Sequence, residues 1–78
     1  MDIRIQVQKF CDELSSHDMW MWGNTCQNIM NNFDYSRPSS FYKISDDNYS
    51  IEGKMKGGQE IRLIRTDGGW SIRWGIPL

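Results

Sequence analysis

The spacing of apolar residues changes once along this chain, near Pro38. Before Pro38, apolar residues recur three or four positions apart, as on one face of a helix: Ile3, Val7, Phe10 and Leu14, then Cys26, Ile29, Met30 and Phe33. From Phe41 onward, apolar and polar residues alternate, which is the period of a half-buried β-strand. A single change from the helical to the strand period predicts an α+β fold in which the helices come first.

Residues 1–35 are expected to form a helical layer. A helix over 3–16 is favoured because the later apolar residues continue only the helical pattern, and Asp2 is a suitable N-cap. The alternation in IRIQVQ also fits a strand over 3–8, so both interpretations of this segment remain open.

The sequence SSHD interrupts the helical pattern. Asp18 or Thr25 is expected to cap a second helix, which several asparagines should make short and marginal. The pattern does not decide whether residues 19–24 are buried or exposed. Pro38 then ends the helical layer, because proline breaks a helix and disfavours helical geometry in the residue before it.

Four strands are expected after Pro38, over residues 41–45, 49–56, 60–66 and 70–76. Asp67-Gly68 is a strong signal for a two-residue hairpin turn. This turn predicts three cross-strand pairs on one face: Arg65–Trp70, Leu63–Ile72 and Ile61–Trp74.

The other two hairpins are assigned registers that keep apolar residues on that same face. The predicted pairs are Met55–Ile61, Gly53–Leu63 and Ile51–Arg65 in one hairpin, and Ile44–Tyr49 and Tyr42–Ile51 in the other. One face then collects Tyr42, Ile44, Tyr49, Ile51, Met55, Ile61, Leu63, Trp70, Ile72, Trp74 and Ile76. Gly53, in mid-strand, indicates a bulge or a place where a bulky ring crosses the sheet.

An antiparallel sheet with one apolar face needs a cover, and the helical layer can provide it. We therefore expect a single α+β domain over residues 1–78, since 78 residues is the length of one domain. In this fold, one or two N-terminal helices pack on one face of a four-stranded antiparallel β-meander formed by residues 41–76.

The other face of the sheet is expected to be basic. Alternation assigns to it Lys43, Lys54, Lys56, Arg62 and Arg73, with Glu52 and Glu60. Arg62 directly opposite Arg73 is unfavourable, and nothing in the fold requires that pair. The face is either a solvated surface or a docking surface for an acidic partner or phosphates.

Catalysis is not indicated by the residue types. His17 is the only histidine, and Cys11 and Cys26 both lie on apolar helix faces, where free buried thiols are expected rather than a disulfide. The spacing of these residues matches no zinc site, and the glycines form no phosphate-binding loop between a strand and a helix. We therefore expect no enzyme activity, no catalytic residues, no metal site and no cofactor.

The expected location is cytoplasmic and away from membranes. No stretch approaches the ~20 apolar residues of a membrane span. The N-terminal residues also lack the basic-then-apolar layout of a secretion signal.

The favoured hypothesis is a small non-enzymatic protein-interaction module, such as an inhibitor, immunity or accessory protein of phage or plasmid type. Its partner would be another protein with an acidic surface. A nucleic-acid-binding or regulatory module that uses the same basic face is the alternative, and homodimerisation through an exposed strand edge or the helices is compatible with either. The candidate contact residues are Lys54, Lys56, Arg62 and Arg73, with Phe41, Trp20 and Trp22 as apolar anchors.

Overall fold

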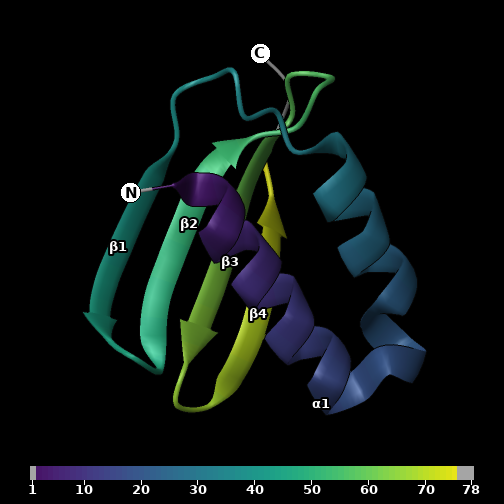
Figure 1. Cartoon of the computed structure of the whole chain (residues 1–78), viewed down its shortest axis with the longest axis vertical. Coiled ribbons are helices and arrows are strands. Elements are labelled where there is room, and N and C mark those ends of the chain that lie inside the picture. The colour runs from purple at the N-terminus through teal and green to yellow at the C-terminus, as the bar shows by residue number, and fades with distance from the viewer. Residues whose placement is uncertain (1, 76–78) are drawn as a thin grey trace.

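The computed structural model describes residues 2–75. One helix is followed by four strands: α1 (Ile3–Asn32), β1 (Ser40–Ser45), β2 (Asn48–Lys54), β3 (Glu60–Thr66) and β4 (Gly69–Trp74). The strands form an antiparallel sheet in the order β1-β2-β3-β4, and α1 covers one face of it (Figure 1). The predicted α+β fold with an antiparallel meander is confirmed. The predicted position of Ile76 on the apolar face lies outside the described residues.

A kink at Asp18 divides α1 into two helical segments, because the backbone of this residue (φ −153°, ψ 77°) is not helical. Asp2 caps the first segment, where its Oδ1 accepts a hydrogen bond from the backbone N–H of Arg4 at 2.9 Å. Asp18 caps the second segment in the same way, accepting from the backbone N–H of Met21 at 3.1 Å. Residues 19–24 are therefore helical, and the second segment is longer than the sequence predicted.

We call the sheet face that α1 covers the inner face, and the opposite one the outer face. Residues 3–8 are helical, and Ile5 on the far side of the helix is 62% exposed, so the strand interpretation is wrong. Both segments of α1 and the inner face share one core, made of Val7, Phe10, Cys11, Leu14, Cys26, Ile29, Phe33, Tyr49, Ile51, Met55, Ile61 and Leu63. No helix within residues 2–75 is long and apolar enough to cross a membrane.

The β3–β4 hairpin has the register that the Asp67-Gly68 turn predicts. The pairs are Arg65–Trp70, Leu63–Ile72 and Ile61–Trp74. Trp70 and Ile72 pack against the core as expected. Trp74 is on the predicted face but remains 43% exposed, at the end of an edge strand.

The β2–β3 register differs from the prediction by two residues, because Met55 pairs elsewhere. Met55 forms a bridge with Phe33 after α1, and its backbone N–H donates to the carbonyl of Gln59 at 2.8 Å. The ladder consequently begins at Lys54–Glu60 and continues with Gly53–Ile61, Ile51–Leu63 and Tyr49–Arg65. A shift of two keeps every side chain on its predicted face.

The β1–β2 register differs by one residue, which reverses the two faces of β1. The turn begins as predicted, but a bulge between Lys43 and Ser45 offsets the ladder to Lys43–Tyr49 and Phe41–Ile51. Phe41 and Lys43 therefore lie on the inner face, which corrects their predicted position on the outer face. Tyr42 and Ile44 lie on the outer face instead of the core, and they are 58% and 89% exposed.

The ring of Phe33 lies across Gly53, as the mid-strand glycine indicated. A Cβ built at Gly53 would overlap Cζ of Phe33 and lie 3.1 Å from Cε2. Two backbone hydrogen bonds fix this junction: Asp34 N–H donates to the carbonyl of Lys54, and Lys56 N–H to that of Asn32, both at 2.8 Å. The end of α1 is thereby attached directly to the end of β2.

Gly53→Ala should destabilise the protein by about 1–3 kcal/mol, because the added methyl group overlaps the Phe33 ring in a packed core. Urea unfolding followed by circular dichroism measures this loss. Gly57→Ala is the matched control, since a Cβ there meets nothing within 4 Å. Its unfolding midpoint should stay near the wild-type value, and equal midpoints for both variants would contradict the contact.

Candidate functional site

The outer face of the sheet is covered by no element of the described chain (Figure 1). Neighbouring strands bring four polar residues into one row across it: Ser40, Glu52, Arg62 and Arg73. The predicted placement of Arg62 directly opposite Arg73 is confirmed.

Two of the predicted binding residues form ion pairs on this face. Nη2 of Arg62 lies 2.9 Å from Oε1 of Glu52, and Nζ of Lys54 lies 3.5 Å from Oε1 of Glu60. Within residues 2–75, Arg73 has no ion-pair partner. The two glutamates thus balance Arg62 and Lys54, whereas no other residue of the described chain balances the charge of Arg73.

The outer face is less basic than predicted. Lys43 lies on the inner side of β1, where its Nζ is 3.0 Å from Oδ1 of Asp46. Lys56 is exposed in the turn after β2, outside the row of outer-face residues. The excess charge is therefore concentrated near Arg73 instead of being spread over five residues.

A shallow depression of about 350 Å³ lies on this part of the sheet, and three predicted binding residues line it together: Lys54, Arg62 and Arg73. The other lining residues that carry polar or aromatic side chains are Ser39, Ser40, Glu52, Glu60 and Trp74. Lys56 is not among the residues that line it. The depression combines guanidinium, ammonium and hydroxyl groups, which can bind carboxylates or phosphates.

The three predicted apolar anchors lie in different environments. Phe41 faces inward and packs on the core, with its ring centroid 5.6 Å from that of Tyr49, so it is not an anchor on the outer face. Trp22 is partly buried against the core. Trp20, by contrast, is 99% exposed.

Trp20 is flanked by two further exposed apolar side chains, Met19 at 71% and Met21 at 65%. We call these three residues the apolar corner, because they follow the kink at Asp18. Exposed apolar side chains that lie next to one another make this corner a candidate interaction site. The question that the sequence left open for residues 19–24 thus has two answers, since Trp22 packs inward and the corner projects outward.

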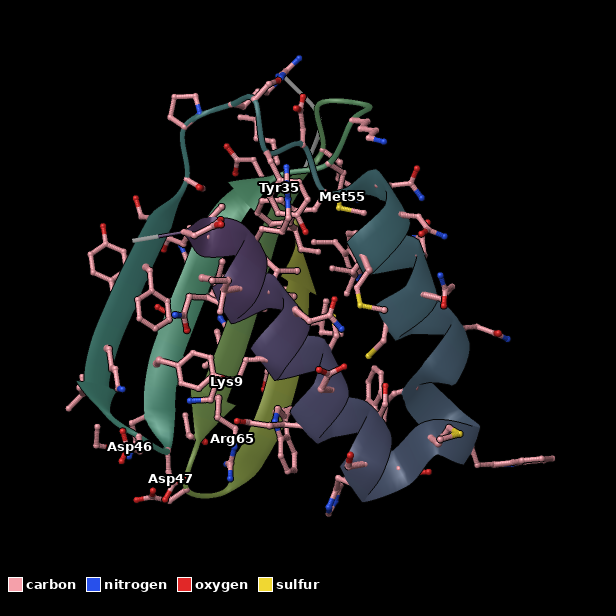
Figure 2. The ribbon with its side chains drawn as sticks, viewed as in Figure 1. Lys9, Tyr35, Asp46, Asp47, Met55 and Arg65 are labelled. Atoms are coloured by element: carbon pink, nitrogen blue, oxygen red, sulfur yellow. The ribbon has the colours of Figure 1, made fainter. Side chains whose placement is uncertain are left out.

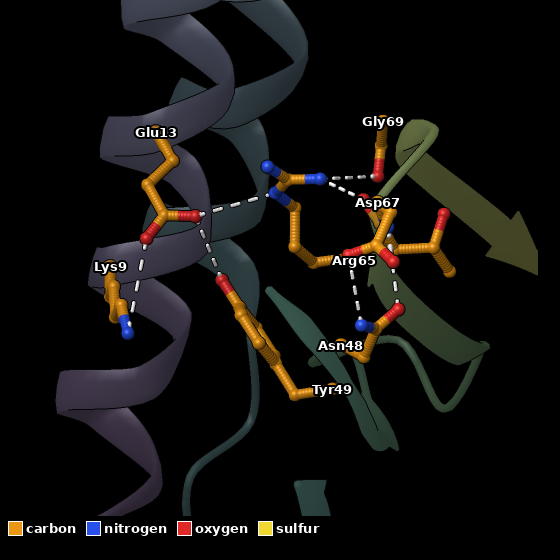
Figure 3. Close-up of polar contacts among 8 residues, drawn as sticks. Lys9, Glu13, Asn48, Tyr49, Arg65, Asp67 and Gly69 are labelled. Atoms are coloured by element: carbon orange, nitrogen blue, oxygen red, sulfur yellow. Dashed lines mark hydrogen bonds and ion pairs between the residues drawn. The ribbon is translucent and has the colours of Figure 1, made fainter. Parts of the chain in front are cut away.

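A polar cluster that the sequence did not predict joins α1 to the sheet (Figures 2 and 3). It consists of Lys9, Glu13, Tyr49 and Arg65. Oε2 of Glu13 accepts a hydrogen bond from the Tyr49 hydroxyl at 3.3 Å and lies 3.8 Å from Nε of Arg65. Nζ of Lys9 lies 3.9 Å from Oε1 of the same glutamate. Burial and then the Glu13 carboxylate raise the pKa of Tyr49 above its ordinary value. The sequence contained one sign of this cluster. Arg65 was predicted on the apolar face, where a buried guanidinium requires a carboxylate or another hydrogen-bond acceptor.

The histidine and the cysteines are not arranged as a nucleophilic pair. The ring of His17 packs on Trp70, with centroids 4.7 Å apart, while Cys11 and Cys26 are free and buried, as predicted. Burial, and then the neighbouring Cys26, raise the pKa of Cys11 to about 12. A thiol that stays protonated at neutral pH is a weak nucleophile. In the described part of the chain, no three His, Cys, Asp or Glu side chains are grouped to hold a metal.

Comparison with models of protein families, with curated proteins and with solved structures gives no match to this chain.

Trp20→Ala should change the free energy of unfolding by less than about 0.5 kcal/mol, because its indole contacts solvent in the folded state. Trp22→Ala should cost about 2 kcal/mol or more, because that ring packs against the core. Urea unfolding of both variants measures the difference. A loss for Trp20→Ala as large as that for Trp22→Ala would show that the Trp20 ring is packed.

Proposed function

We propose that this protein is a small non-enzymatic protein-interaction module that docks the outer face of its sheet on an acidic surface of another protein. The observation that supports this best is the pair formed by Arg62 and Arg73. Like charges on neighbouring strands destabilise a sheet, and Glu52 is close to Arg62 alone. A carboxylate from a partner would compensate Arg73, for which residues 2–75 supply no counter-charge.

Charge alone provides little affinity, because exposed ion pairs contribute about 0–1 kcal/mol. The outer face also carries Tyr42 and Ile44, which the bulge in β1 turns towards solvent. A partner that covers the row from β1 to β4 would bury these apolar side chains and pair with Arg73. The proposed interface thus has an apolar part for affinity and a basic part for orientation.

A nucleic acid is the other ligand to consider for the same face. The carboxylates of Glu52 and Glu60 would then lie close to phosphates, which weighs against this alternative. Gel shifts with mixed DNA and RNA at low salt should show no complex. A complex that weakens steeply with added salt would favour the nucleic acid instead.

Arg73→Glu should separate binding from stability. A glutamate opposite Arg62 replaces a like-charge pair with an opposite-charge pair, so the free energy of unfolding should rise by about 0.5 kcal/mol. The affinity for the partner should fall by about 10-fold or more, because the charge that its acidic group would meet is reversed. Urea unfolding gives the stability, and titration with the partner, captured by the wild type and then purified, gives the affinity.

Lys56→Glu is the matched control, since it makes the same charge change outside the depression. Its affinity should stay within about 3-fold of the wild-type value, because exposed charges away from the contact contribute little. If Arg73→Glu folds and binds as the wild type does, the outer face is not the docking surface.

A further inference from the structure

The apolar corner differs from the rest of the exposed helix surface. Its three consecutive side chains are between 65% and 99% exposed. Exposed positions later in the same segment are occupied by amides instead: Asn24, Gln27, Asn28, Asn31 and Asn32. Polar residues thus suit the solvent-facing side of this segment, and the chain departs from them only at Met19, Trp20 and Met21.

The corner is held in place and is not a loose loop. The Asp18 carboxylate accepts a hydrogen bond from the backbone N–H of Met21, with 3.1 Å between Oδ1 and N. This hydrogen bond fixes the first turn of the second segment. Trp22, the next residue, packs against the core and anchors that turn to the rest of the molecule. Trp20 is thereby presented in a preorganised position, which lowers the entropic cost of binding. Tryptophan is also the residue type most enriched at the energetic centres of interfaces.

The charges around the corner indicate what kind of surface it fits. No lysine or arginine lies between Lys9 and Arg37, whereas Asp18 directly precedes the corner and Asp12 is exposed on the preceding helical segment. Glu13 and Asp34 do not add to this charge, because Glu13 pairs with Lys9 and Arg65 and Asp34 pairs with Arg37. The carboxylates of Asp12 and Asp18 would repel an anionic membrane and the acidic partner suited to the outer face. A binding site with basic residues at its rim would attract this side of the molecule.

From the exposure, the anchoring and the charge, we infer that the apolar corner is a second docking surface. Its occupant is a pocket on another protein, lined by apolar side chains that receive the Trp20 ring and rimmed by basic residues. The corner belongs to α1, which covers the inner face, so it is separate from the outer face of the sheet. The protein therefore has two surfaces of opposite charge preference, and each can be disabled separately.

The test begins with a photo-crosslinking amino acid at position 20 of the full chain, with the same group at Gln27 as the matched control on the same segment. The protein that crosslinks from position 20 alone is then purified and titrated with unlabelled variants. Trp20→Ala should weaken binding by about 30-fold or more, which is the loss expected at an interface hot spot. Trp20→Phe should retain part of the affinity, because a smaller ring still enters the pocket.

Two variants at Asn24 test the basic rim, since this residue follows Trp20 by one helical turn. Asn24→Lys should weaken binding, whereas Asn24→Asp should leave it unchanged or strengthen it. Arg73→Glu should bind this partner as the wild type does, so this inference and the proposed function succeed or fail separately. Unchanged unfolding midpoints in all variants would exclude loss of the fold as the cause.

Three outcomes would overturn the inference. The first is that the crosslinked protein binds Trp20→Ala as tightly as it binds the wild type. The second is that the wild type, but not Trp20→Ala, binds vesicles of phosphatidylcholine with or without phosphatidylserine, which would assign the corner to lipid. The third is a mass in light scattering that rises with concentration in the wild type alone, which would assign the corner to a second copy of this chain.

Discussion

The arrangement of this molecule depends on the contact between the Phe33 ring and Gly53. The ring lies where a side chain of β2 would otherwise be, and backbone hydrogen bonds on either side hold the end of α1 against the end of β2. From that end the second helical segment packs against the core of the inner face, and beyond the kink at Asp18 the first segment packs against the same core. Both candidate surfaces follow from this, because the outer face stays uncovered and the turn of the chain at the kink projects from the helical layer.

Local chemistry made much of this fold predictable from the sequence. The register between β3 and β4 followed from the Asp67-Gly68 turn, since that register matches two pairs of apolar residues, Leu63–Ile72 and Ile61–Trp74. The register of β1 could not be predicted in the same way. In FYKI, apolar residues occupy both odd and even positions, so alternation does not decide which face of the strand is buried. Counting them favoured Tyr42 and Ile44 as core residues, whereas a bulge that the pattern does not encode places Phe41 there.

The candidate surfaces were predictable to different degrees for related reasons. Arg62 and Arg73 could be placed together because their positions depend only on the well-determined hairpin. The exposure of Trp20 could not be derived, since it depends on whether the helix restarts at Asp18 or at Thr25. The Glu13 cluster was missed because it joins residues of α1, β2 and β3 that only the packing of helix on sheet brings together.

The net charge of −1 conceals a separation of charge between the two layers. Among residues 2–75, the carboxylates of Asp12 and Asp18 on α1 have no ion-pair partner, and on the outer face the guanidinium of Arg73 has none. Such a separation costs little in folding, because the charges involved are exposed and screened by solvent. The same separation would favour the approach of an acidic protein to the sheet and of a basic protein to the helices. The proposed role of Trp20 is consistent with this separation, because a ring that binds a pocket with a basic rim would lie on the more acidic layer.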